Sequence, residues 1–162
     1  MRIVELTDFF LGPGATVLQN GEMLTHLKIP VTRNRQGSVY YKLSTRKAMD
    51  LAFVGVAILL ELEGDDHISK ARIALGAVAS RPFLVPKAGE ILVGKKLSDD
   101  VIAEVSAAVG SRAKPMDNAD MDIYWRKQVT PDLVGYALRE LRGDDMSATR
   151  RRIARHELRE IS

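Results

Sequence analysis

Side chains that could form a site gather in residues 38–52. Tyr40 and Lys42 stand two positions apart, which would place both on the same face of a strand. Arg46 and Asp50 stand four positions apart, so on a helical turn the guanidinium and the carboxylate could pair. A lysine on the polar face of a strand is more often solvated than functional, and such an ion pair is usually structural. The residues alone therefore mark a candidate site without assigning its chemistry.

Two stretches that could position this site alternate with the period of two that is typical of strands. Residues 23–30 end at Pro30 and carry Leu24 as an apolar exception on their polar face. Residues 39–44 form the second predicted strand, which could pair with the first.

A hairpin is predicted in the next part of the chain. Residues 53–63 and 68–79 alternate on either side of Gly64-Asp65-Asp66, a sequence typical of turns. Small residues in the returning strand indicate that another layer packs closely on the sheet. Near the N-terminus, Gly12-Pro13-Gly14 predicts a turn after a short strand.

Helices are predicted after the strands. Residues 87–93 form a short candidate, and Ser98 with the acids that follow it is good N-cap and first-turn chemistry for the next helix. Residues 120–141 have a helical pattern that Pro131 would divide into two helices. Residues 147–161 form a last amphipathic helix rich in arginine. Strands followed by helices predict an α+β fold, with a small antiparallel sheet of about three to four strands covered on one face by helices.

Composition limits the classes of function. The chain has 162 residues, 46% of them hydrophobic and 28% charged, which suits one globular domain with tails. It has no cysteine, which excludes disulfides and cysteine-ligated iron–sulfur clusters and makes cytoplasmic residence the default expectation. The longest apolar run, residues 51–60, is about half of what a membrane span needs.

Two binding classes are also disfavoured. The net charge of +3 is a small excess, and glutamates interleave the terminal arginines, so a solvated helix face is a better reading than a nucleic-acid patch. The histidines are far apart and lack the spacing of metal ligands. They are His26, His67 and His156.

The stretch around Lys42 resembles a segment of the flavin-binding subunits of the molybdenum hydroxylases, the family of xanthine dehydrogenase and aerobic carbon monoxide dehydrogenase. The pattern is Y-x-K-x-x-x-R-x-A-M-D-x-A, which begins here at Tyr40 and ends at Ala52. TDFFLGPGATVLQNGEMLTHLKIP precedes it, and ARIALGAVASRP, AGEILVGKKLSDDVI and DIYWRKQVTPDLVGYAL follow in the family's order. The match continues to about Arg142 and implies a C-terminal portion of such a subunit, with the same sheet-and-helix fold.

The resemblance implies roles for individual residues. The family's lysine, here Lys42, approaches the pyrimidine end of the flavin ring, where a cation would stabilise negative charge that builds on reduction. An apolar side chain, here Leu24, lies against the ring, and an aromatic near Tyr40 or Tyr41 shields it in some members. Asp50 belongs to a segment that alters access to the flavin. The candidate cofactor-binding residues are therefore Leu24, Tyr40, Lys42 and Asp50, with no catalytic residue and no metal ligand.

The resemblance weakens near its end. Asp117, Tyr124 and Arg126 fall where members commonly show P-x-S-D-x-R-x-S-A-x-Y-R, but Asn118-Ala119 replaces part of that pattern. Interface roles cannot be carried over from this stretch.

The family's two glycine-rich FAD loops, close to A-G-G-x-S and T-x-G-G-N, do not occur in the sequence. Backbone N–H groups of such loops bind the FAD pyrophosphate. We therefore expect FAD to bind only together with the N-terminal FAD-binding domains of the subunit. Residues 1–20 would be the tail of such a domain or a linker, residues 21–143 the flavoprotein C-terminal domain, and residues 144–162 a basic helix.

Two functions are compatible with these observations. The first is a component of an FAD-dependent oxidoreductase complex, inactive alone, which helps enclose the flavin and docks partners. Those partners would be the FAD-binding part of the subunit, an iron–sulfur small subunit and a molybdopterin large subunit. The second is a non-catalytic assembly or binding module that retains the fold without FAD, and a homo-oligomer is possible. Other chains determine the substrate and the terminal electron acceptor.

Overall fold

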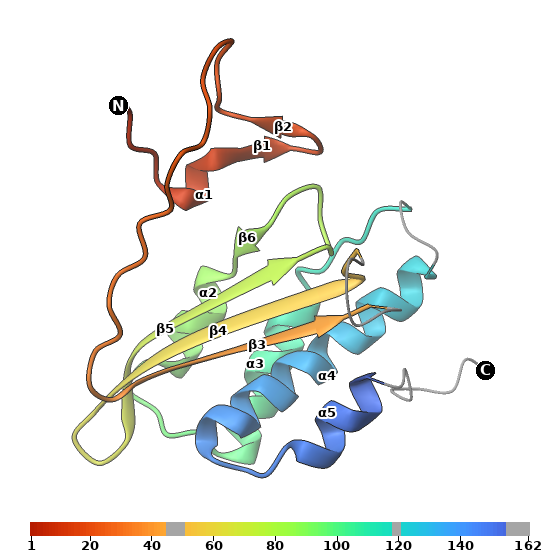
Figure 1. Ribbon diagram of the computed structural model, residues 1–162. Coiled ribbons are helices and arrows are strands. Elements are labelled where there is room, and N and C mark those ends of the chain that lie inside the picture. The colour runs from red at the N-terminus through yellow and green to blue at the C-terminus, as the bar shows by residue number, and fades with distance from the viewer. Residues whose placement is uncertain (45–50, 118–120, 155–162) are drawn as a thin grey trace.

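The computed structural model describes residues 1–44, 51–117 and 121–154, and it shows an antiparallel sheet with helices packed on one face (Figure 1). The main strands come first in the chain and the helices that cover them come later, as the sequence predicts. Since the buried apolar residues come from one face of the sheet and from the helices, the core lies between these two layers. The α+β fold class is confirmed.

The main sheet has four antiparallel strands in the order β3-β4-β5-β6. They are β3 (Gln36–Leu43), β4 (Val54–Glu63), β5 (His67–Gly76) and β6 (Phe83–Leu84). The hairpin β4–β5 confirms the prediction, and Gly64 and Asp66 in its turn have φ values of 50° and 64°. These positive φ values explain a glycine and an aspartate there, because both tolerate the left-handed region.

Strand β3 alternates between the two faces as its sequence predicts. Tyr41 and Leu43 are buried beneath the helices, whereas Tyr40 and Lys42 are exposed on the opposite face. Antiparallel pairing of β3 with β4 fixes this register, because a slip of one residue would bury Lys42 and expose Leu43.

Four helices of the described chain cover the sheet, and the N-cap predicted at Ser98 is observed. They are α2 (Pro86–Leu92), α3 (Asp99–Gly110), α4 (Ile123–Arg142) and α5 (Ser147–Ala154). The Ser98 side chain accepts a hydrogen bond from the Val101 N–H, which confirms it as the N-cap of α3. Gly143 ends α4 in the left-handed conformation with a φ of 104°. Within the described residues, no helix combines the length and the hydropathy that crossing a membrane would require.

The predicted break at Pro131 is wrong, because α4 continues through this residue. Pro131 packs against Gly110 of α3, and a Cβ on Gly110 would lie only 2.4 Å from the Pro131 Cγ. The residue before the proline, Thr130, donates a hydrogen bond from its hydroxyl to the Arg126 carbonyl at 2.7 Å. Close packing of two helices thus offsets the local cost of a proline inside a helix.

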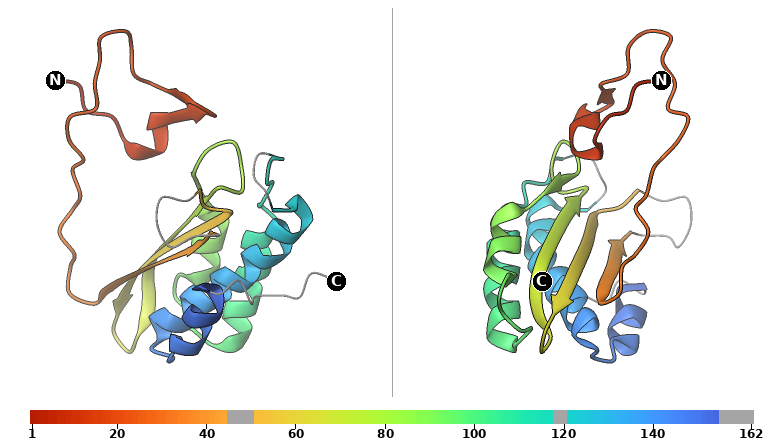
Figure 2. Two further views of the ribbon diagram at one scale, coloured as in Figure 1. Left: turned by 45° about the vertical axis from the view of Figure 1, so that its right-hand side comes forward. Right: turned by 90° about the vertical axis from the view of Figure 1, so that its left-hand side faces the viewer.

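The N-terminal part of the chain forms a small hairpin and an extended arm that stands clear of the sheet (Figures 1 and 2). It contains α1 (Leu6–Phe9), β1 (Phe10–Gly12) and β2 (Ala15–Thr16), with the predicted turn between the two strands. The predicted strand at residues 23–30 is wrong, because this segment is extended and exposed throughout and pairs with no strand among the described residues. An alternating sequence pattern is not sufficient for a strand, because the backbone must also form hydrogen bonds with a neighbouring strand.

A polar cluster attaches α5 to the rest of the fold. The Tyr41 hydroxyl donates a hydrogen bond to the Glu140 carboxylate at 2.6 Å, and Arg150 binds the same carboxylate through Nε at 2.9 Å and Nη2 at 2.8 Å. The Arg150 guanidinium also lies 4.2 Å from the centre of the Tyr41 ring. Helix α5 begins at the predicted Ser147, and the part of the predicted helix beyond Ala154 lies outside the described residues.

We predict that Gly110→Ala lowers the free energy of unfolding by roughly 1–3 kcal/mol, because the new methyl group would overlap the Pro131 ring. Urea denaturation followed by circular dichroism measures the change. Pro131→Ala in the Gly110→Ala background removes the overlapping ring and should recover much of the loss. An equal loss in the single and double variants would contradict this explanation.

The hydrogen bonds from Arg150 and from Tyr41 lower the pKa of Glu140 from its ordinary value of 4.5, although burial opposes the shift. A depressed folded-state pKa means that the carboxylate contributes stability above its unfolded-state pKa and loses that contribution as pH falls through the folded-state pKa. The unfolding free energy of the native chain should therefore decrease more steeply below about pH 4.5 than that of Glu140→Gln. Urea titrations of both proteins between about pH 7 and pH 3 measure this, and parallel curves would exclude the linkage.

Candidate functional site

Tyr40 and Lys42 lie on the face of the main sheet that the helices leave uncovered, which we call the open face. Figure 2 shows the helices on one side of the sheet and the N-terminal arm on the other. Cross-strand pairing places Lys42 beside Gly55 and Gly55 beside Gly76. The neighbouring row on the same face is Tyr40, Ala57 and Ala74. At this end of the sheet the open face therefore has a floor of small residues with a cation and a phenol at its edge.

The Tyr40 side chain lies over this floor. Its hydroxyl is 3.3 Å from the position that a Cβ on Gly55 would occupy, and 56% of the residue is exposed. Tyr41 is only 1% exposed and binds Glu140 on the helical side. Of the two tyrosines that the sequence offered as an aromatic shield, only Tyr40 can reach a group on the open face.

The other two predicted site residues are not part of this arrangement. Leu24 lies on the extended arm, 49% exposed, and not on a strand of the sheet. Asp50, together with Arg46 of the predicted ion pair, lies outside the described residues. The structure thus brings together Tyr40 and Lys42, while the roles of Leu24 and Asp50 stay predictions.

A buried arginine at the end of the sheet was not among the predicted site residues. Arg126 of α4 is 1% exposed. Its Nε donates a hydrogen bond to the Phe53 carbonyl at 3.1 Å, its Nη1 donates to the Met116 carbonyl at 2.8 Å, and its Nη2 donates to the Ala77 carbonyl. One guanidinium therefore joins the start of β4, the end of β5 and the segment that precedes α4.

These bonds fix the end of the sheet at which Lys42 lies. Phe53 donates its N–H to the Leu43 carbonyl at 2.8 Å, which links the Arg126 contact to the residue after Lys42. Ala77 follows Gly76 and has a φ of 64°, which is unfavourable for alanine and is maintained by its bond to Arg126. The sequence contained a signal for Arg126, because it stands seven residues before the buried Leu133 and so shares the inner face of the helix. Burial lowers the pKa of the guanidinium.

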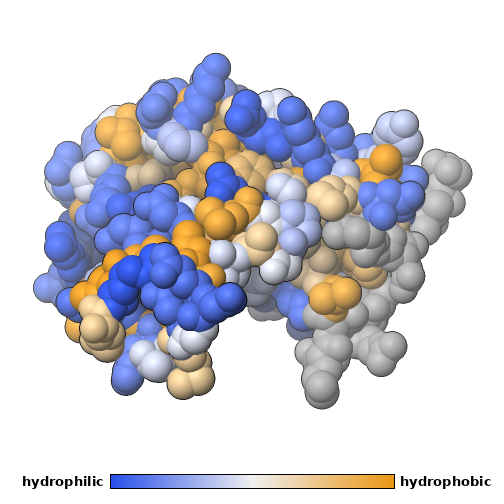
Figure 3. Space-filling view, turned by 90° about the horizontal axis from the view of Figure 1, so that it is seen from above, coloured by the Kyte–Doolittle hydropathy of each residue, from blue (hydrophilic) through white to orange (hydrophobic). Residues whose placement is uncertain are grey.

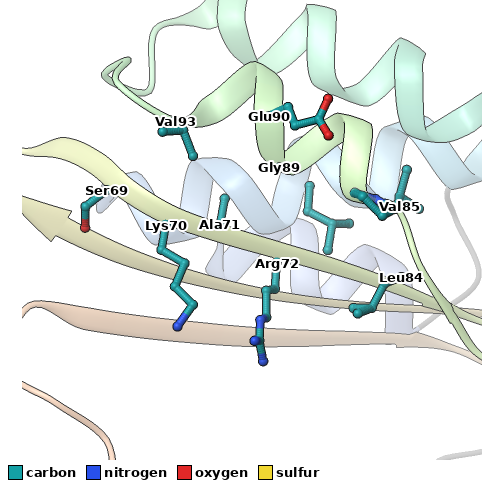
Figure 4. Close-up of a pocket in the computed structure, with 11 residues that line it drawn as sticks. Ser69, Lys70, Ala71, Arg72, Leu84, Val85, Gly89, Glu90 and Val93 are labelled. Atoms are coloured by element: carbon teal, nitrogen blue, oxygen red, sulfur yellow. The ribbon is translucent and has the colours of Figure 1, made fainter. Parts of the chain in front are cut away.

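A groove lies between β5 and α2 (Figure 4). A Cβ on Gly89 would lie 2.8 Å from the Ala71 carbonyl oxygen, so the helix approaches the strand edge very closely there. Lys70 and Arg72 project away from α2 in Figure 4. The groove therefore lacks polar groups that converge on a ligand. In the part of the chain that is described, no three acidic, histidine or cysteine side chains gather as metal ligands.

Comparisons with known proteins agree with this fold. The family model of the CO dehydrogenase flavoprotein C-terminal domain matches residues 39–141. The chain is 31% identical over 140 residues to the glyceraldehyde dehydrogenase medium chain of Sulfolobus acidocaldarius, covering 86% of this chain and 49% of that protein. It is 27% identical over 110 residues to the xanthine dehydrogenase FAD-binding subunit of Escherichia coli O157:H7, covering 67% of this chain and 37% of that protein.

A solved structure is similar over most of the chain. The reconstituted CO dehydrogenase from Oligotropha carboxidovorans superposes with a TM-score of 0.79 at 28% sequence identity, covering 88% of this chain and 49% of that chain. The present chain thus spans about half the length of the medium chain and the solved chain that it matches.

We predict that Arg126→Met lowers the free energy of unfolding by about 3 kcal/mol, because buried carbonyl groups would lose their donor. Arg126→Lys keeps the charge but cannot span the carbonyl groups, so its loss should be intermediate. Urea denaturation measures both variants. In both variants the hydrogen-exchange rate of the Phe53 amide should increase more than the rates of the amides in the β4–β5 hairpin. Unchanged stability together with unchanged exchange rates would contradict the role assigned to Arg126.

Proposed function

The chain belongs to the CO dehydrogenase flavoprotein C-terminal domain family, and from this premise we propose that it forms part of an FAD-containing electron-transfer subunit of a molybdenum hydroxylase. In this role it helps enclose the flavin ring and docks partner subunits. The FAD-binding subunit of xanthine dehydrogenase among its relatives supports the cofactor assignment. The chain is then a component of an oxidoreductase and is inactive alone.

The observation that carries the proposal is the position of Lys42. This lysine is exposed on the open face, beside the glycine floor and within two residues of Tyr40 on the same strand face. A flat ring can approach the floor at Gly76, where nothing lies within 4 Å of the position of a Cβ, whereas the Tyr40 hydroxyl occupies the space over Gly55. The residues present therefore fit the edge of a flavin ring.

Each residue of this edge has a distinct task in the proposal. Bound FAD supplies the electron transfer. Lys42 holds a positive charge at the ring edge and stabilises negative charge there. Tyr40 covers the adjacent part of the floor and limits the access of water, while Leu24 and Asp50 complete the enclosure from the arm and from the segment after β3. Arg126 keeps the floor in place through the backbone.

The phosphates of FAD need a second polypeptide segment in this account. The glycine-rich loops that would bind them do not occur in the sequence. We propose that residues 1–20 connect to the part that carries those loops, that residues 21–143 form the flavin-edge domain, and that residues 144–162 add a terminal helix. An iron–sulfur subunit and a molybdopterin subunit are the further partners.

The alternative is an assembly module that retains the fold without FAD. It requires only the core between the sheet and the helices, which does not include the open face. The two proposals differ in whether the assembled protein contains flavin and in whether Lys42 affects it.

We predict that Lys42→Gln makes the reduction potential of the flavin more negative by roughly 20–40 mV, because loss of the cation removes about 1–2 kcal/mol of stabilisation from the reduced ring. The measurement is a spectroelectrochemical titration of the assembled protein. Arg72→Gln is the matched control, because it removes a positive charge from the open face two cross-strand rows away from the row of Lys42. Equal potentials for native protein and Lys42→Gln would reject the flavin-edge role of Lys42.

A further inference from the structure

Strand β3, which carries Lys42, lies at the edge of the main sheet. In the sheet order β3-β4-β5-β6, its neighbour among the described strands is β4. The Arg35 and Leu43 carbonyls accept hydrogen bonds from the side of β4, so the odd-numbered peptide groups of β3 face that strand. A strand that is paired along one edge opens more easily than an inner strand. The position of Lys42 therefore depends on what holds β3 from the helical side.

Tyr41 ties β3 to the helical layer. It shares a peptide bond with Lys42, and successive side chains of a strand point to opposite faces, so fixing the Tyr41 ring also fixes the direction in which Lys42 leaves the strand. The Tyr41 hydroxyl donates to the Glu140 carboxylate of α4 at 2.6 Å, and only 1% of the residue is exposed. Burial raises the pKa of this hydroxyl, which therefore stays protonated and remains a donor.

Helix α5 completes this attachment through Arg150. The Arg150 guanidinium binds both Glu140 oxygens, through Nε at 2.9 Å and Nη2 at 2.8 Å, and lies 4.2 Å from the centre of the Tyr41 ring. Two parallel bonds fix the orientation of a carboxylate as well as its place. The Glu140 side chain is 31% exposed, so without Arg150 it would be free to turn towards water and release Tyr41. We call these three residues the clamp.

The buried attachment of α5 is otherwise small. Of its eight residues, the structure buries Ile153, and Met146, just before the helix, is 8% exposed. The connection from α4 is held by Arg142, which binds Asp144 at 2.6 Å and Asp99 at 2.9 Å. The family model ends at residue 141, so α5 lies outside the part of the chain that it matches. The clamp thus joins the family domain to a helix beyond it.

The N-terminal segment contacts a different part of the sheet. The Phe10 carbonyl accepts a hydrogen bond from Arg81 Nη1 at 2.7 Å, which ties this segment to the connection between β5 and β6. Figure 1 places the segment at the end of the molecule away from α5, and Figure 3 shows hydrophilic side chains mixed with apolar ones at that end. The attachment of β3 near Lys42 is therefore provided by the helical layer.

We propose that Arg150 is a positioning residue for Lys42, which holds Glu140 and the Tyr41 ring so that the Lys42 ammonium stays at the flavin edge. This inference rests on the proposed function for the presence of the flavin. The interaction between a cation and the charge of a reduced ring weakens with distance, so a shift of β3 would reduce the effect of Lys42. Arg150 itself lies on the helical side and acts through Tyr41.

The test is a cycle of reduction potentials in the assembled protein. The shift that Lys42→Gln causes in the flavin potential is measured in the native, Arg150→Gln, Arg150→Lys and Arg151→Gln backgrounds. In Arg150→Gln this shift should fall to about half of its native size or less, because a mobile β3 places the cation less well. Arg150→Lys keeps the charge but not the paired bonds, so we expect an intermediate shift.

Arg151→Gln is the matched control for charge. It removes a positive charge from an exposed position of α5 that is not part of the clamp. The Lys42→Gln shift should keep its native size in this background. A role of Arg150 in stability alone would likewise leave the shift unchanged in Arg150→Gln, so the cycle separates positioning from stability.

Hydrogen exchange of the chain without its partners tests the clamp independently of flavin. The amides of Val39 and Tyr41, which face β4, should exchange about tenfold faster in Arg150→Gln than in the native chain, while the amides between β4 and β5 keep their native rates. Arg151→Gln should leave all of these rates unchanged. Both variants should fold, because the Arg150 side chain is 45% exposed and lies outside the apolar core.

Unchanged exchange of Val39 and Tyr41 in Arg150→Gln would overturn the inference. A smaller Lys42→Gln shift in Arg151→Gln, equal to that in Arg150→Gln, would overturn it too, because charge alone would then be the cause. Faster exchange of β3 in Arg150→Gln, together with an assembled protein that holds no flavin, would reject the proposed function and retain the hold of Arg150 on β3. A flavin protein with the same Lys42→Gln shift in every background would retain the proposed function and reject the role of Arg150.

Discussion

The open face depends on a buried charge. Arg126 reaches from the helical layer to the end of the sheet and binds backbone carbonyls of Phe53, Ala77 and Met116. Burying a guanidinium costs free energy unless its N–H donors form hydrogen bonds. Arg126 can therefore stay buried only while these three segments remain in place around it. The bonds also offset the strain of an alanine with a positive φ at position 77. Two of these carbonyls adjoin the start of β4 and the end of β5. Arg126 therefore fixes the position of the floor beside Lys42, although its own side chain does not reach the open face.

The two faces of the sheet serve different purposes. The helical face is filled by large apolar side chains and supplies the stability of the domain. The open face has small residues at one end and charged ones at the other, which an antiparallel sheet tolerates because one side can be solvated. The surface available for a cofactor is therefore directed away from the helices, where it does not compete with the core.

The sequence predicted the features that neighbouring residues determine and missed those that depend on contacts between distant segments. The β4–β5 hairpin and the Ser98 cap follow from neighbouring residues, and alternation alone places Lys42 on the face opposite the core. The continuity of α4 was missed because Gly110, far from Pro131 in sequence, provides the space for its ring. The arm was mistaken for a paired strand because its pattern specifies a face but not a partner. The bonds of Arg126 join segments that are distant in the chain, so helical spacing could show its burial but not its role.

The most direct test of the account is the flavin content of the natively assembled protein. The protein would be purified through a tag on this chain, and FAD would be quantified by absorbance after denaturation against the amount of this chain. We expect FAD to be equimolar with the chain and to be retained through gel filtration. A stable assembly that contains this chain without flavin would contradict it and favour the assembly module.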